Sequence, residues 1–278
     1  MSRALPFEAP GSLLPLPRPL MTGEVLDAAF RLFRAGLLRC LPYSGLAVLV
    51  FELPTAYATF MAPSGAAGLL AIGRLRPVSW VIAALLATAL LGVITLRLRA
   101  ISLGVRPRFR IELAAVLKRW PAALLATLGA FGFPLLLYSM SAALTNILPG
   151  AGLALIGVPL LWPAALFVVA LPAFWCDGLG PFAAIAQALR ISRRRSWRMF
   201  GALLATGCMV AVFYAVSAIV VGMLSPMLGR ADLFLIAAVR SMLALVVGAL
   251  GVPFALAVLI VAYEDLKLRE RERQDLLR

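Results

Sequence analysis

Six apolar segments, each about as long as a lipid bilayer is thick, limit the possible folds of this chain more than any other feature. A helix needs about 20 consecutive apolar residues to cross roughly 30 Å of hydrocarbon. Prolines inside such segments are tolerated because neighbouring membrane helices can satisfy the freed carbonyl groups. We therefore predict an all-α polytopic membrane protein with six transmembrane helices, at residues 40–62, 78–98, 121–144, 153–175, 199–225 and 238–262.

The composition agrees with this fold class. Hydrophobic residues make up 63% of the 278 residues and charged residues only 14%. Soluble domains are about half apolar and about a quarter charged. One aqueous core cannot bury so large an apolar excess, so lipid must solvate most of the surface.

The basic residues predict the orientation. Of the 26 Lys and Arg residues, 22 lie before the first span, after the last, or in the second and fourth loops, when Arg97 at the end of the second span is counted with the second loop. Because basic residues collect on the cytoplasmic side, both termini are expected in the cytoplasm, as an even number of crossings requires. The predicted domains are an irregular, proline-rich cytoplasmic tail at 1–21, a six-helix membrane domain at 22–263 and a charged cytoplasmic tail at 264–278.

A recurring order of elements predicts an internal repeat. Short amphipathic stretches at 22–39, 108–120 and 180–198 precede the first, third and fifth spans, and each becomes basic toward its end. Such stretches can lie as helices in the membrane interface. We therefore expect a pseudo-threefold repeat of interfacial helix plus helical hairpin, with three short cytoplasmic-side amphipathic helices.

The residues that support most enzyme chemistry are missing. The chain has no histidine, no phosphate-binding P-loop and no nucleophile-elbow motif. The acidic pairs Glu264 with Asp265 and Glu270 with Glu272 have basic neighbours and are expected on a solvated helix. The three cysteines are scattered rather than spaced for a metal. We predict no enzyme, no cofactor and no metal, and we attribute the net charge of +14 to topology rather than to nucleic-acid binding.

Glu52 is the most unusual polar residue inside a predicted span. It lies about 18 Å along the first span, near the middle of the bilayer. A carboxylate inside the membrane is energetically costly and therefore suggests a functional site, with Arg240 as a possible ionic partner. The alternative is a protonated, structural Glu52 that donates to the backbone carbonyl released by Pro54.

Two further motifs concern packing and charge. In the last span, Ala244 with Gly248 and Gly251 with Ala255 fit the small-xxx-small spacing, which permits close helix approach within the bundle or between subunits. The densest basic cluster either anchors orientation or contacts anionic lipid head groups. Its residues are Arg190, Arg193, Arg194, Arg195, Trp197 and Arg198.

Two segments resemble a broad bacterial family. Asp177, Gly178, Ala188, Leu189, Arg190 and Ser192 match an acidic residue and Gly followed by A-L-x-x-S. Tyr263, Asp265, Leu266 and Arg269 match an ending of the form Y-x-D-L-R-x-R, with Lys267 in place of its first arginine. This pattern is similar to that of the glycerophosphoryl diester phosphodiesterase membrane domain and related six-span proteins. The resemblance implies a bacterial inner-membrane protein. It implies no catalysis, because in that family the reaction belongs to a separate soluble barrel that uses histidine.

These observations lead to a functional prediction. We expect a non-enzymatic inner-membrane accessory or scaffold protein that organises a protein partner or anionic phospholipids through its basic cytoplasmic face. The alternative is a small transporter or lipid-handling protein with a polar intramembrane cavity around Glu52.

Overall fold

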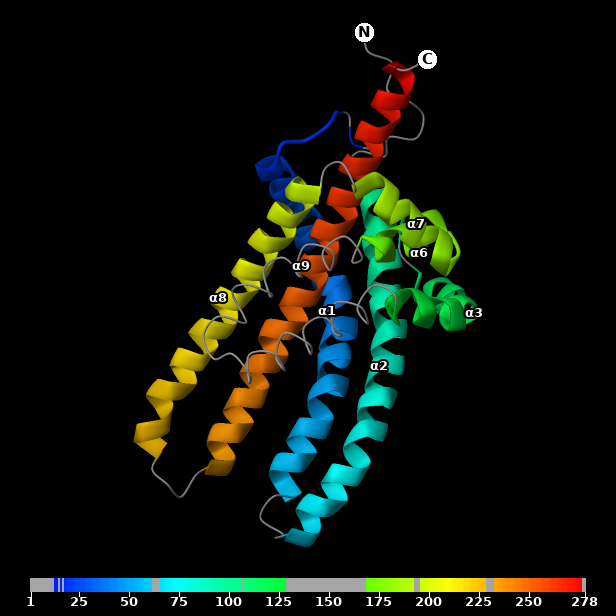
Figure 1. The fold of residues 1–278 in the computed structure, drawn as a ribbon. Coiled ribbons are helices and arrows are strands. Elements are labelled where there is room, and N and C mark those ends of the chain that lie inside the picture. The colour runs from blue at the N-terminus through cyan, green and yellow to red at the C-terminus, as the bar shows by residue number, and fades with distance from the viewer. Residues whose placement is uncertain are drawn as a thin grey trace, which may run out of the picture.

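The computed structural model describes residues 13–14, 16, 18–61, 66–106, 108–128, 169–192, 196–228 and 233–276. Within these ranges all regular structure is helical, which confirms the predicted all-α class (Figure 1). The helices are α1 (Thr22–Met61), α2 (Ala66–Ser102), α3 (Phe109–Thr127), α6 (Ala170–Asp177), α7 (Pro181–Ser192), α8 (Ser196–Leu228) and α9 (Leu233–Leu276).

Four of these helices are long and apolar enough to cross a membrane. Their apolar segments are Thr22–Val50 in α1, Ile82–Ser102 in α2, Phe200–Val220 in α8 and Ser241–Leu276 in α9. The four helices run alongside one another, with α1 packed against both α2 and α9, and α8 against α9 (Figure 1). These helices support a membrane-embedded bundle. Most of the predicted spans 121–144 and 153–175 lies outside the described residues, so six crossings and the threefold repeat stay predictions.

One predicted boundary is wrong. We expected an interfacial helix at 22–39 separate from the first span, but α1 is one helix of 40 residues. Its buried stripe, Val25, Ala29, Leu32, Gly36 and Cys40, continues across the expected boundary. Tertiary packing on this uninterrupted face favours a single helix over a break. The charged segment predicted at 264–278 continues α9 through Leu276, and its position in the cytoplasm stays a prediction.

The long helices extend beyond any hydrocarbon layer. At 1.5 Å per residue, α1 is about 60 Å long and α9 about 66 Å, whereas the hydrocarbon is about 30 Å thick. The start of α1, the ends of α2 and α9, and the short helices α6 and α7 lie toward one end of the bundle, in the upper part of Figure 1, with α3 below them beside α2. We call this end, which also carries the ion pairs described below, the polar end.

The N-terminal segment is held against the polar end. As predicted, residues 13–14, 16 and 18–21 form no helix. However, the backbone N–H groups of Leu13 and Leu14 both donate to the carbonyl of Ser102, at 2.9 and 3.0 Å. Leu14 is buried in the same hydrophobic core as Leu32 and Leu98. This part of the predicted tail is therefore part of the fold.

Small residues let α1 and α9 approach closely. A Cβ atom on Gly248 would stand 2.8 Å from Cγ2 of Val48. One helical turn nearer the polar end, the Ser44 hydroxyl donates to the carbonyl of Ala249 at 2.7 Å. The Gly248 part of the small-xxx-small pattern thus serves packing within the bundle.

Candidate functional site

Ion pairs join separate elements at the polar end. Each uses a carboxylate whose side chain is at most 16% exposed. Three of the four link residues from different helices, so they hold the ends of the helices together. The pairs are Arg97 with Glu112, Arg99 with Glu264, Lys267 with Asp177, and Arg269 with Asp265.

The pair between α2 and α3 is the most deeply buried. Arg97 donates from Nε and Nη2 to the same oxygen of Glu112, Oε2, at 3.0 and 2.8 Å. Its Nη1 donates to the carbonyl of Arg39 at 2.8 Å, and the guanidinium lies 4.4 Å from the ring centroid of Tyr43. The other carboxylate oxygen, Oε1, is buried and has no hydrogen-bond partner among the described residues.

Asp177 joins α6 to α9. Its Oδ2 accepts from the Tyr263 hydroxyl at 2.6 Å and its Oδ1 from Lys267 at 2.7 Å. Gln187 of α7 donates to the Tyr263 oxygen at 2.9 Å. Burial alone raises the pKa of Asp177, but the bonds from Lys267 and Tyr263 outweigh it, so this pKa lies below the ordinary range. Asp177 is therefore held as a carboxylate.

A left-handed glycine lets α6 end directly after Asp177. Gly178 has φ 70°, a conformation that glycine adopts without steric cost, and it follows the last helical residue. Its carbonyl accepts from Arg119 of α3 at 2.6 Å. The turn thus fixes Asp177 between α3 and α9.

The acidic pair Glu264 and Asp265 does not lie on a solvated helix, so that prediction is wrong. Glu264 pairs with Arg99 of α2, and Asp265, 5% exposed, accepts from the backbone N–H of Leu20 at 2.7 Å. These partners are 165 and 245 residues away in sequence, which is why local charge patterning missed them. For Glu270, the expected local pairing is present, with Arg273 at 3.7 Å.

The segments that carried the family resemblance meet at the polar end. Asp177 from the first segment bonds to Tyr263 from the second, and Lys267 pairs with the same carboxylate. Asp265 and Arg269 form the neighbouring pair. The two segments that carried the resemblance are therefore in direct contact in the folded protein, through Asp177 and Tyr263.

Glu52 lies in α1, half-buried. Its carboxylate acts electrostatically on the phenol of Tyr214 in α8, a residue that sequence reasoning did not single out. The Tyr214 hydroxyl is also 3.5 Å from the position of a Cβ on Gly248. Helical spacing alone gave no signal that Tyr214 lies within electrostatic range of Glu52. The side chain of Arg240, the expected partner, lies outside the described residues.

The predicted basic cluster is described only in part. Arg190 is exposed near the end of α7, and Trp197, 72% exposed, stands near the start of α8. The Trp197 ring packs edge-on against Phe200, with centroids 6.0 Å apart. Residues 193–195 and the side chain of Arg198 lie outside the described part of the chain, so lipid contact there stays a prediction.

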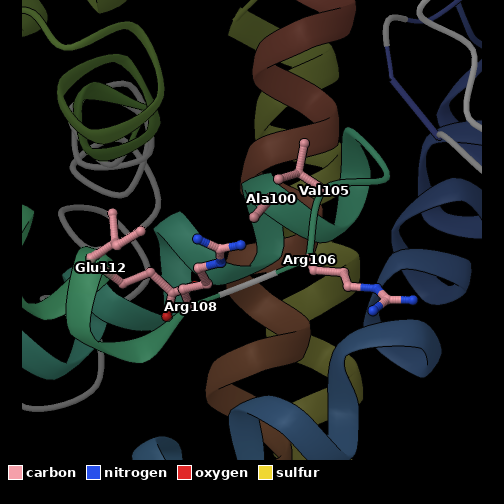
Figure 2. Close-up of a pocket in the computed structure, with 6 residues that line it drawn as sticks. Ala100, Val105, Arg106, Arg108 and Glu112 are labelled. Carbon is pink, nitrogen blue, oxygen red and sulfur yellow. The ribbon is translucent and has the colours of Figure 1, made fainter.

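A pocket that the sequence did not indicate lies where α2 passes into α3. It encloses about 450 Å³ and is lined by Ala100, Val105, Arg106, Arg108, Ile111 and Glu112 (Figure 2). Arg106 and Arg108 are both exposed, and neither has an ion pair with any residue the structure describes.

No family model, curated protein or solved structure matches this chain. The resemblance noted from the two short segments therefore stays a prediction, and the function must be argued from the molecule itself.

Proposed function

We propose that this protein is a non-enzymatic accessory or scaffold protein of the bacterial inner membrane, which organises anionic phospholipids or a protein partner through a basic cytoplasmic face. The proposal includes six crossings, the threefold repeat and both termini in the cytoplasm. It rests on the distribution of basic residues in the sequence and on the charges at the polar end.

The observation that supports the proposal most strongly is the difference in charge between the buried and the exposed side chains at the polar end. The acidic side chains Glu112, Asp177, Glu264 and Asp265 are all used in ion pairs inside the fold. Several exposed basic side chains have no such pair within the described ranges. They are Arg106, Arg108, Arg110, Lys118 and Arg190. The outer surface thus keeps a positive charge that anionic head groups can match.

The arrangement of Asp177, Tyr263 and Lys267 favours structure over catalysis. The carboxylate is held ionised by two hydrogen bonds, one from the Tyr263 hydroxyl and one from the Lys267 ammonium group. A general base needs a pKa near the working pH and a free path to substrate. This triad therefore supports a stabilising role.

The test is affinity capture of the full chain in mild detergent, followed by identification of the bound lipids and proteins. We expect enrichment of anionic phospholipids over their membrane abundance, or one recurring protein partner. A matched variant with Arg106, Arg110, Lys118 and Arg190 changed to Gln should lose the enrichment. Wild-type protein that retained lipids in their membrane proportions and captured no partner would contradict the proposal.

The alternative, a small transporter, is favoured by one observation. Glu52 of α1 and Tyr214 of α8 are two polar groups from different helices that lie within electrostatic range of each other. A proton- or substrate-coupled carboxylate should lose function in Glu52→Gln, whereas a structural one should tolerate it. The same capture experiment separates the two functions, because a scaffold keeps its bound lipids or partner in Glu52→Gln.

A further inference from the structure

The pocket between α2 and α3 combines unmatched positive charge with apolar walls. Arg106 and Arg108 contribute two guanidinium groups without ion pairs among the described residues. Glu112 also lines the pocket, but Arg97 matches its charge. Its oxygen without a partner is buried beneath the surface rather than exposed at the mouth. The pocket is therefore positive overall.

The apolar part of the pocket continues onto the surface. Val105 is 58% exposed and Ile111 61% exposed, and both line the pocket. Phe109, between the arginines and Ile111, is 44% exposed. A small soluble anion would gain nothing from this apolar rim, whereas the acyl chains beside a lipid phosphate would cover it.

The position of the pocket also favours a lipid. It begins at Ala100, near the end of the apolar segment Ile82–Ser102, where hydrocarbon is expected to give way to head groups. It ends at the first turn of α3, whose first backbone N–H groups favour an anion. Arg106 and Arg108 follow this segment directly, so we expect them near the phosphates of the head groups.

Arg106 and Arg108 both line the pocket, from positions two residues apart in the sequence. In Figure 2 the Arg106 side chain extends away from Arg108 and Glu112. Because both arginines are exposed, rotation of the Arg106 side chain alone would allow it to turn toward the phosphate.

We propose that this pocket binds the phosphodiester of one anionic phospholipid, held by Arg106 and Arg108, with its acyl chains lying over Val105, Phe109 and Ile111. This proposal rests on the proposed function, since it names one site within the basic face. It is distinct from the predicted contact at Arg190 to Arg198.

The test is native mass spectrometry of the detergent-solubilised full chain titrated with phosphatidylglycerol. The variant Arg106→Gln/Arg108→Gln should bind the first lipid about thirtyfold more weakly, because each basic residue near anionic lipid contributes about fivefold. Arg110→Gln/Lys118→Gln removes the same charge from exposed positions that do not line the pocket. This matched control should retain the first lipid site. All four side chains are exposed, so the fold should persist, as helical content and elution volume would verify.

Two further binding measurements identify the ligand. Phosphatidylcholine, which carries no net charge, should bind at least tenfold more weakly than phosphatidylglycerol, and millimolar inorganic phosphate should not displace the bound lipid. Displacement by phosphate alone would overturn the lipid assignment. If wild-type protein prefers phosphatidylglycerol but both double variants bind it equally well, the pocket proposal fails and the proposed function stands. If wild-type protein shows no preference for anionic lipid, the pocket proposal fails together with the lipid-binding form of the proposed function, and only organisation of a protein partner remains.

Discussion

At the scale of single residues, the polar end depends on charges that the fold removes from water. The side chains of Arg97 and Glu112 are 9% and 8% exposed, so the charge of each is balanced mainly by the charge of the other. Breaking a buried pair costs far more than the pair contributes, because the remaining charge stays buried without a partner. The exposed pair Arg18 with Glu24 faces solvent and contributes little.

This difference predicts the effect of removing one partner. Arg97→Met should lower the free energy of unfolding by about 3–5 kcal/mol, because Glu112 would remain buried without its cation. The double variant Arg97→Met/Glu112→Leu should recover most of that loss. Arg18→Ala should cost about 0–1 kcal/mol. Denaturant unfolding in detergent, followed by circular dichroism, measures all three. A double variant as unstable as Arg97→Met would contradict the account.

The lowered pKa of Asp177 predicts that the stability of the fold depends on pH. Because its pKa is lower in the folded protein than in the unfolded chain, the ionised carboxylate stabilises the fold fully at neutral pH. Its contribution should fall as the pH drops below the ordinary aspartate pKa of about 3.9, and should be gone below the folded pKa. The Asp177→Asn variant should be less stable than the wild type at neutral pH, and its stability should fall less steeply as the pH is lowered. Asp275→Asn, at an exposed position of α9, should keep the wild-type profile.

At the scale of the helices, local pattern predicted the apolar segments but not their ends. The predicted spans 40–62 and 238–262 overlap the apolar segments Thr22–Val50 of α1 and Ser241–Leu276 of α9 only in part. The boundaries failed because the buried stripe from Val25 to Cys40 and the packing of Tyr263 and Leu266 extend each helix beyond its apolar window. These contacts come from other helices, so the local pattern alone could not show them.

Close approach of α1 and α9 predicts an asymmetry between two glycines. A Cβ on Gly248 would stand 2.8 Å from Val48, whereas one on Gly251 would meet Val210 at 3.6 Å, an ordinary contact. Both changes gain the same helix propensity, about 1 kcal/mol. Relative to Gly251→Ala, Gly248→Ala should therefore be less stable by about 1–3 kcal/mol, the usual cost of overpacking.

A second change tests the cause. If the clash with Val48 is responsible, Val48→Ala should make Gly248→Ala milder than it is in the wild-type background. Thermal unfolding in detergent of the four proteins gives the coupling. Equal stability of Gly248→Ala and Gly251→Ala would show that α1 and α9 do not approach as described.

At the scale of the whole molecule, the sequence predicted the class of protein better than the candidate site. Composition and apolar windows indicated an all-helical membrane protein because burial in lipid constrains every residue of a span. The contacts of Asp177 with Tyr263 and of Glu264 with Arg99 join residues that are 86 and 165 positions apart in the sequence. The pocket lined by Arg106 depends on how the chain turns between α2 and α3. Such features arise only from the packed arrangement.

The central claim is that the bundle spans the membrane with its polar end in the cytoplasm, where its unmatched arginines meet anionic lipid. Single cysteines at Arg110, on the polar end, and at Ala66, the first residue of α2, test it in a background where Cys40, Cys176 and Cys208 are replaced by Ala. A membrane-impermeant maleimide applied to intact spheroplasts should label Ala66→Cys alone, and should label Arg110→Cys only after permeabilisation. Labelling of Arg110→Cys in intact spheroplasts would contradict the account.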